Sequence, residues 1–119
     1  MLLCGCDYRE IDRLAIITSA SFDVAEEGMW EMGLEVIDAS GPENEGVKTK
    51  FYRVEGETIF EAEKAAEKLL GRTLYWGFAE LAAVSEEVLA GRLEELADWI
   101  MRDKQMRLSA VLLVSRAES

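Results

Sequence analysis

LAIITSASFD (residues 14–23) and WEMGLEV (residues 30–36) are the two stretches that decide the fold of this chain. The first is apolar and β-branched and contains no residue that breaks a strand. In the second, apolar side chains alternate with glutamates and a glycine, which is the period of a strand with one face in water. Glu26-Glu27-Gly28 supplies a turn between them. Together the two stretches predict an antiparallel β-hairpin.

A long loop and a third strand follow the hairpin. Residues 39–47 (ASGPENEGV) hold the only proline of the sequence and two glycines, a composition typical of a loop. Residues 48–54 are more polar and contain two lysines, and lysines discourage pairing with a further strand. We therefore expect this third strand near an edge of the sheet.

The clearest helix begins at Thr58-Ile59-Phe60-Glu61, which is a capping box. The threonine hydroxyl can accept a hydrogen bond from the backbone N–H of Glu61, and the Glu61 carboxylate can reach back to the cap. Gly71 is a natural stop for this helix. The spacing of the apolar residues predicts one buried helical face, made of Ile59, Ala62, Ala66, Leu69 and Leu70.

The remaining residues predict two more strands and two more helices. Residues 74–84 are apolar and aromatic and favour one strand with a glycine inside it. Ser85, followed by two glutamates, opens a short helix that Gly91 ends. Residues 107–116 are apolar on both faces, which favours a central, buried strand. Between them, a further helix is expected to bury Leu93, Leu96, Ala97 and Ile100, with Trp99 and Met101 widening its apolar side.

The predicted order of elements is β-β-β-α-β-α-α-β. The simplest architecture for it is an α+β fold with one mixed, mostly antiparallel sheet and its helices packed on one face. The chain has 119 residues, half of them hydrophobic, which suits a single domain with one core. We assign residues 7–119 to this domain, whereas residues 1–6 (MLLCGC) look like the last few residues of a signal peptide.

Charge and composition exclude several function classes. The net charge is −11, so the surface repels nucleic-acid phosphates and makes nucleic acid a poor partner. It also repels anionic lipid head groups, so we do not expect adsorption on a membrane through a basic patch. The sequence has no histidine, which removes the commonest general base and the commonest metal ligand. Neither a Gly-x-Ser-x-Gly motif nor a glycine-rich phosphate loop is present.

The remaining candidate sites favour structural explanations. Cys4-Gly5-Cys6 supplies two thiolates without the second pair that a tetrahedral metal site needs. Glu43-Asn44-Glu45 does not have the spacing of a calcium loop and is expected to be a hydrated surface segment. Trp30, Trp76 and Trp99 could line a ligand pocket, but their apolar neighbours favour the core. We therefore expect a protein without catalytic residues, cofactor or metal.

Several motifs together resemble one known family. Leu3-Cys4-Gly5-Cys6 is similar to a bacterial lipobox, and the stretch from Cys6 to Thr18 resembles the start of mature Ger(x)C (GerAC-type) spore germination lipoproteins. Three further blocks resemble the same family in the same order, namely Gly56–Ala62, Gly71–Gly77 and Arg102–Ala110. Members of the family are longer, and this chain resembles their N-terminal domain. Phe78 stands where the family commonly has a histidine.

The resemblance implies a function and a location. Cys6 would carry the lipid and become the first residue of an extracytoplasmic lipoprotein on the outer face of the spore's inner membrane. The domain would assemble with integral-membrane A and B subunits into a germinant receptor, without catalytic residues. Two acyl chains or more give stable anchoring where surface charge does not. The third strand or the 39–47 loop is the contact surface that we expect.

Two alternatives remain open from the sequence alone. The first is a soluble, stand-alone protein-interaction module, with a homodimer through an exposed strand edge as one form. The absence of a full signal peptide before Cys6 favours it. For the lipoprotein, the same absence would mean that the sequence is a fragment, a mis-started reading frame or a stand-alone relative. The second is a small enzyme or ligand-binding protein with carboxylates around an aromatic pocket, which no residue pattern favours. Fractionation distinguishes the lipoprotein from the soluble module.

Overall fold

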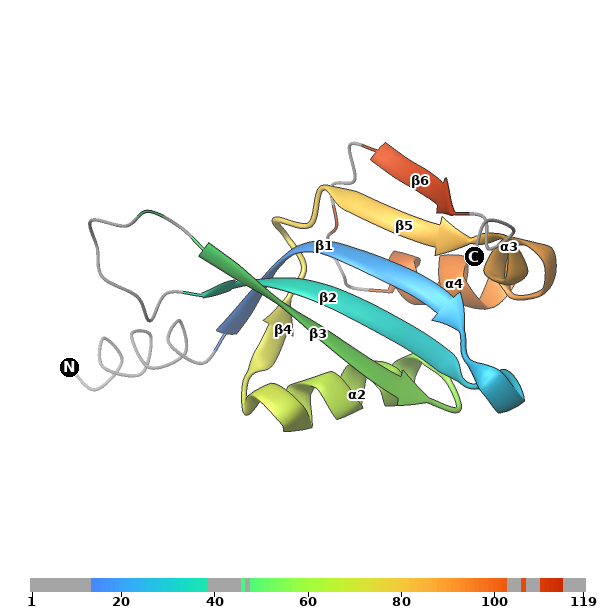
Figure 1. The fold of residues 1–119 in the computed structure, drawn as a ribbon, viewed down its shortest axis with the longest axis horizontal. Coiled ribbons are helices and arrows are strands. Elements are labelled where there is room, and N and C mark those ends of the chain that lie inside the picture. Colours follow the sequence, from blue (N-terminus) through green and yellow to red (C-terminus); the bar gives the residue numbers. More distant parts are fainter. Residues whose placement is uncertain (1–13, 39–45, 47, 103–105, 107–109, 115–119) are drawn as a thin grey trace.

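The computed structural model describes residues 14–38, 46, 48–102, 106 and 110–114. They form an α+β fold built on one mixed sheet, as predicted. Five strands follow the order β3-β2-β1-β5-β6, and β4 pairs with β1 outside this path (Figure 1). The pairings β1–β2 and β2–β3 are antiparallel, whereas β1–β4, β1–β5 and β5–β6 are parallel.

The predicted hairpin is confirmed. Strands β1 (Leu14–Val24) and β2 (Trp30–Asp38) pair antiparallel, with Phe22 opposite Met32. A single 3₁₀ turn, η1 (Glu26–Gly28), connects them, and its last residue has a positive φ of 80° that glycine adopts without strain.

A β-bulge at Thr18 was not foreseen from the sequence. Ile17 pairs with Val36 and Ser19 pairs with Glu35, so two steps along β1 match one step along β2. The bulge changes which alternate residues point inward: the buried residues are 15 and 17 before it and 20 and 22 after it. Strand β1 also exchanges its parallel partner here, from β4 to β5.

Strand β3 (Lys48–Gly56) lies at one edge of the sheet, as predicted. Its side chains are mostly exposed until Val54. Two ion pairs connect it to β2, from Lys50 to Asp38 at 3.6 Å and from Arg53 to Glu31 at 3.5 Å.

Helix α2 (Ile59–Leu70) has the predicted cap. The Thr58 hydroxyl accepts from the N–H of Glu61 at 3.0 Å, and Gly71 ends the helix with a φ of 67°. The Glu61 carboxylate reaches one residue further back than predicted and accepts from the N–H of Glu57 at 3.2 Å. Ile59, Ala62 and Ala66 are buried, but Leu69 is 57% exposed, so its assignment to the buried face was wrong.

The single strand predicted for residues 74–84 is two strands. These are β4 (Thr73–Tyr75) and β5 (Leu81–Ser85), separated by a turn in which the N–H of Ala79 donates to the carbonyl of Trp76 at 3.1 Å. Both residues of that turn contact are buried. Because of this turn, β4 pairs with the first half of β1 and β5 pairs with the second half, beyond the bulge.

The C-terminal half brings two helices and a last strand. Helix α3 (Glu86–Gly91) begins at Ser85, whose hydroxyl accepts from the N–H of Val88 at 3.3 Å, and ends at Gly91 as predicted. Helix α4 (Leu93–Met101) buries Leu96 and Trp99. Leu93 and Met101 are 50% and 83% exposed, so their predicted places on the buried face were wrong.

Strand β6 (Ala110–Val114) corrects the prediction of a central strand. Among the strands that the structure describes it pairs with β5 alone and forms the edge opposite β3, and Val111 is 53% exposed. The apolar composition identified a strand but could not fix its place in the sheet. The other residues of the predicted strand, 107–109 and 115–116, lie outside the described part of the chain.

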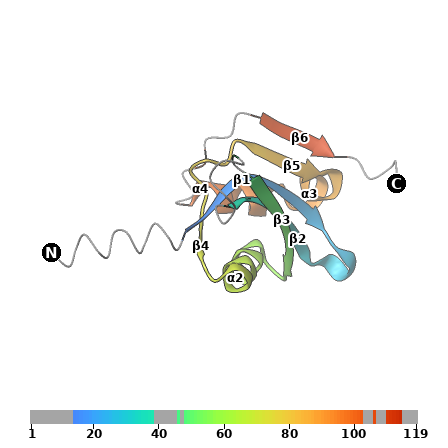
Figure 2. The same cartoon turned by 60° about the vertical axis from the view of Figure 1, so that its left-hand side comes forward.

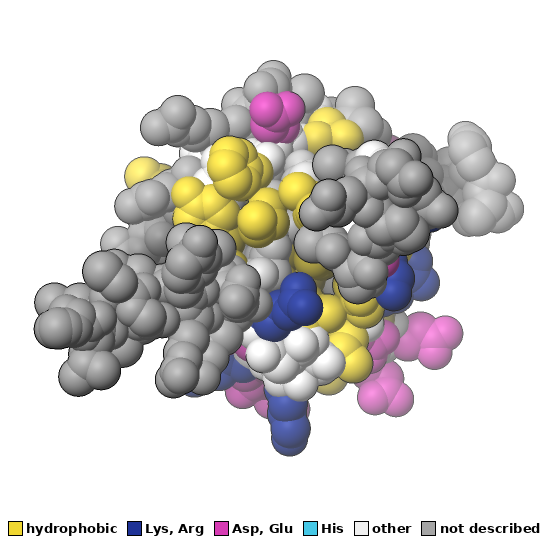
Figure 3. Space-filling model, turned by 90° about the vertical axis from the view of Figure 1, so that its left-hand side faces the viewer, with side chains coloured by type: hydrophobic (Ala, Val, Ile, Leu, Met, Phe, Trp, Pro, Cys, Tyr) yellow, Lys and Arg dark blue, Asp and Glu magenta, His cyan; other side chains and the backbone are white. Residues whose placement is uncertain are grey.

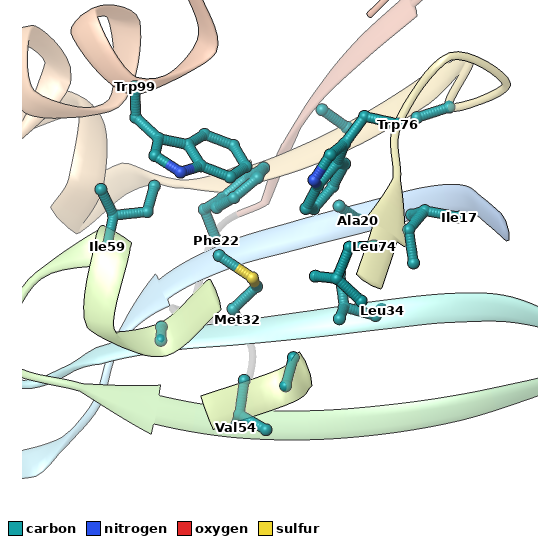
Figure 4. Close-up of a cluster of buried hydrophobic side chains, with 14 of the residues drawn as sticks. Ile17, Ala20, Phe22, Met32, Leu34, Val54, Ile59, Leu74, Trp76 and Trp99 are labelled. Carbon is teal, nitrogen blue, oxygen red and sulfur yellow. The ribbon is translucent and has the colours of Figure 1, made fainter. Parts of the chain in front are cut away.

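One core lies between the concave face of the sheet and the helices (Figure 2). Phe22, Trp76 and Trp99 meet edge to face there, with ring centroids of Trp99 5.6 Å from Phe22 and 5.0 Å from Trp76 (Figure 4). Trp30 is buried in the same cluster. The prediction that all three tryptophans belong to the core is confirmed.

Candidate functional site

The indole N–H of each buried tryptophan donates a hydrogen bond to a glutamate carboxylate. The indole N–H groups of Trp76 and Trp99 donate to the two carboxylate oxygens of Glu63, at 3.1 and 3.0 Å. Trp30 donates to Glu95 at 2.9 Å. These carboxylates therefore connect helices to the core, and the arrangement stabilises the fold.

A second polar cluster lies at the β-bulge. The Glu35 carboxylate accepts from the hydroxyls of Thr18 at 2.8 Å, Ser19 at 3.0 Å and Thr49 at 3.1 Å. The hydrogen bond from Thr18, followed by those from Ser19 and Thr49, holds the pKa of Glu35 below its ordinary value, against the opposing effect of burial. The Glu35 carboxylate thus connects β1, β2 and β3 through its hydrogen bonds. Because its charged form is stabilised, it is a poor general acid.

No metal centre emerges in the described part of the chain. Nowhere in it do three His, Cys, Asp or Glu side chains come together in a group that could hold a metal ion. The candidate residues Cys4, Cys6 and Glu43–Glu45 lie outside the described ranges. None of the described helices is long and apolar enough to cross a membrane.

A shallow cavity of about 220 Å³ opens at the end of the molecule where β1 begins. Its lining combines the polar side chains Lys50, Asp38, Tyr52 and Arg72 with apolar ones. Lys50 is paired with Asp38, whereas Arg72 makes no hydrogen bond or ion pair within the described part of the chain. The cavity thus places Arg72 beside apolar side chains.

An exposed aromatic pair lies at the same end. Tyr75 and Phe78 meet edge to face with ring centroids 5.6 Å apart, and they are 37% and 60% exposed. Tyr75 ends β4 and pairs with Ile16 of β1, while Phe78 lies in the turn that follows. A Cβ on Gly77 would lie 2.5 Å from the Tyr75 hydroxyl, so the missing side chain makes room for the tyrosine.

We call this end the N-terminal pole and define it by six residues. They are Leu14, Ile16, Lys50, Arg72, Tyr75 and Phe78. Figure 3 looks at this end of the molecule, where hydrophobic side chains gather above the centre of the view and a basic side chain lies near the centre, with further basic and acidic side chains toward the margins.

Few features of the sequence indicate the N-terminal pole. Residues 74–84 were assigned to one strand, which hid the turn that presents Phe78. A signal was present, because the buried residues Trp76 and Ala79 are three positions apart, a spacing that no continuous strand allows on one face. The cavity joins residues from four elements and has no signature in any one of them.

The fold and these sites define the class of protein to which the chain belongs. It is an α+β domain whose described polar clusters stabilise the fold and whose distinctive surface is an apolar and basic end. Residues 7–119 match the family described as the spore germination protein N-terminal domain, and the chain belongs to that family. The resemblance inferred from the sequence motifs is confirmed.

Two relatives from Bacillus subtilis (strain 168) show how the chain relates to longer proteins. It is 28% identical to spore germination protein KC, over 97% of this chain and 31% of that protein. It is 26% identical to YfkR, whose name provisionally assigns it to spore germination, over 100% of this chain and 33% of that protein. The chain therefore spans about a third of the length of these relatives. No solved structure matches it significantly.

Proposed function

We propose that this chain acts in spore germination as the N-terminal domain of a germinant-receptor lipoprotein, anchored through Cys6. The observation that carries the proposal is the family match, which begins at residue 7, directly after the lipobox cysteine. The domain serves as a non-catalytic part of a receptor on the outer face of the spore's inner membrane. The names of the two relatives support the biological role.

The two cysteines provide a matched test of anchoring. Cys6→Ser removes the sulfur that would carry the lipid, while Cys4→Ser changes a position that is not expected to be modified. We expect the native protein to yield an intact mass that begins at Cys6 and includes acyl chains, in the detergent-extracted membrane fraction of its spores. Cys6→Ser should lose the acyl mass and the membrane association, and Cys4→Ser should keep both. An unmodified native protein in the soluble fraction would contradict anchoring and favour a soluble interaction module.

We further propose that β3 and the adjoining 39–47 loop contact the integral-membrane A and B subunits. Among the described strands β3 pairs with β2 alone and forms an edge of the sheet, and Phe51 on it is 74% exposed. Anchoring confines the domain beside its partners, so a weak contact is sufficient there.

Phe51→Glu tests this contact. Because the side chain is exposed, we expect unchanged thermal stability but weaker co-purification with the membrane subunits and slower germination. Leu93→Glu, at an apolar residue 50% exposed on α4, is the control. Deletion of residues 41–46 tests the loop in the same assays. Normal assembly and germination with both changes would contradict the proposed surface.

A further inference from the structure

The ends of this acidic molecule differ in charge. The described residues of η1 and the first turns of α3 and α4 carry six glutamates at the end away from the start of β1, namely Glu26, Glu27, Glu86, Glu87, Glu94 and Glu95 (Figure 1). The opposite end has Lys48, Lys50, Lys68 and Arg72. Its described acidic side chains are Asp38, which is paired with Lys50, Glu67, which accepts from the N–H of Leu74 at 3.2 Å, and the exposed Glu80. A chain with a net charge of −11 thus has one end where the described basic side chains outnumber the acidic ones.

The same end is also where large apolar side chains are exposed. Phe78 and Tyr75 stand beside β1, and Leu69, 57% exposed, lies in the last turn of α2. Aromatic side chains next to lysine and arginine are typical of protein surfaces that bind at the boundary between lipid headgroups and acyl chains. The aromatic rings are stable at that depth, and the long cationic side chains reach the lipid phosphates.

Chain geometry places this end beside the membrane if Cys6 is lipidated. Seven residues separate Cys6 from Leu14, and a chain extends at most about 3.6 Å per residue, so β1 begins within about 29 Å of the anchor. Strand β1 has 11 residues and is therefore about 33 Å long. The acidic end lies about that distance from the start of β1.

We propose that the domain rests on the anionic lipid surface through its N-terminal pole, with Tyr75 and Phe78 at headgroup depth and Lys50 and Arg72 facing lipid phosphates. This inference rests on the proposed function, because the anchor supplies the high local concentration that a small contact requires. It adds an orientation: the acidic end points away from the membrane.

The test uses the full 119-residue chain with both cysteines replaced by serine. Because the sequence has no histidine, an N-terminal hexahistidine tag attaches it at one place to vesicles that contain nickel-chelating lipid. Phe78→Cys and the control Leu93→Cys each receive an environment-sensitive nitrobenzoxadiazole label. On vesicles of phosphatidylcholine and phosphatidylglycerol, we expect the label at 78 to shift its emission to shorter wavelength and to be quenched by spin-labelled lipid. The label at 93 should behave as it does in solution.

Charge reversal tests the basic part of the pole. Each lysine or arginine near an anionic leaflet changes association about fivefold, so Arg72→Glu should reduce the lipid contact of the label at 78 by at least that factor. Arg102→Glu makes the same change in net charge at a residue paired with Asp98 and should leave the contact unchanged. Circular dichroism confirms folding of every variant.

Three results would overturn the proposal. Equal responses of the two labels would show that the domain has no preferred orientation. Equal effects of Arg72→Glu and Arg102→Glu would show that Arg72 makes no specific contact with the lipid. An emission shift to shorter wavelength from the label at 78 in the absence of vesicles would show that the pole contacts a second copy of the chain. Because the histidine tag replaces the native lipid, none of these results bears on lipidation of Cys6, which the intact-mass experiment decides separately.

Discussion

At the scale of single residues, the buried or half-buried carboxylates of this protein act as acceptors that connect elements. Glu63 joins Trp76 to Trp99, and Glu35 collects three hydroxyl donors around the β-bulge. The Glu35 pKa is lowered mainly by the Thr18 hydroxyl. Because the folded state favours the charged form, the carboxylate stabilises the fold above its unfolded pKa of 4.5, and this contribution is lost as the pH falls through the lower folded pKa.

Glu35→Gln should therefore destabilise the protein at neutral pH and lose its effect in acid. We expect a decrease of about 1 kcal/mol in the free energy of unfolding at neutral pH, since hydrogen bonds to a charged acceptor are replaced by neutral ones. Urea unfolding at successively lower pH measures the difference from the native sequence. Glu55→Gln, at an exposed residue of β3, is the control. A difference that stayed constant well below pH 4.5 would contradict the role of the charge.

At the scale of elements, two glycines in the sheet allow close approach for different reasons. A Cβ on Gly56, the last residue of β3, would lie 2.4 Å from the backbone nitrogen of Ala62 and 2.8 Å from the carbonyl carbon of Glu61. The missing side chain lets the strand pack directly on the first turn of α2. A Cβ on Gly33 would lie 2.4 Å from the Ser21 hydroxyl, which can rotate away.

Gly56→Ala and Gly33→Ala should consequently differ in cost. The first forces β3 away from a helix backbone, and we expect it to destabilise the domain by about 1–3 kcal/mol. The second displaces only a hydroxyl and also stiffens the unfolded chain, so its effect should remain below about 1 kcal/mol. Thermal melting of the two variants compares them directly. Equal melting temperatures would show that β3 can move away from α2 at no cost.

At the scale of the whole molecule, Trp99 is where the sheet and two helices meet. It lies on α4, contacts Phe22 of β1 and Trp76 edge to face, and donates to Glu63 of α2 (Figure 4). A domain of this size has a total stability of about 5–15 kcal/mol, so the loss of one such side chain affects the whole fold.

Trp99→Ala should cost about 3–5 kcal/mol of stability, because it leaves a large cavity and removes the hydrogen bond to Glu63. Met101→Ala, two residues further along the same helix, removes a side chain that is 83% exposed and should change stability by less than about 0.5 kcal/mol. Guanidinium unfolding followed by circular dichroism gives both values. A Met101→Ala cost comparable to that of Trp99→Ala would place the core contacts of α4 elsewhere.

Local chemistry was sufficient to predict most elements of this fold and its family. The capping box at Thr58, the stop at Gly71 and the alternation in residues 30–36 depend on groups a few positions apart, so the sequence contains the whole interaction. The family motifs likewise lie in short blocks. These features determined the hairpin, the edge strand β3, the helix limits and the resemblance that the family match confirmed.

Tertiary structure alone decided which residues are buried and where the surface sites lie. Met101 and Leu69 are apolar and helical but exposed, because burial depends on which element packs opposite them. The apolar residues 110–114 form an edge strand because β5 is their one partner in the sheet. The N-terminal pole joins Arg72, Lys50 and Phe78 across distant parts of the chain. Such a surface arises from the positions of the strands in space, which periodicity along one strand does not specify.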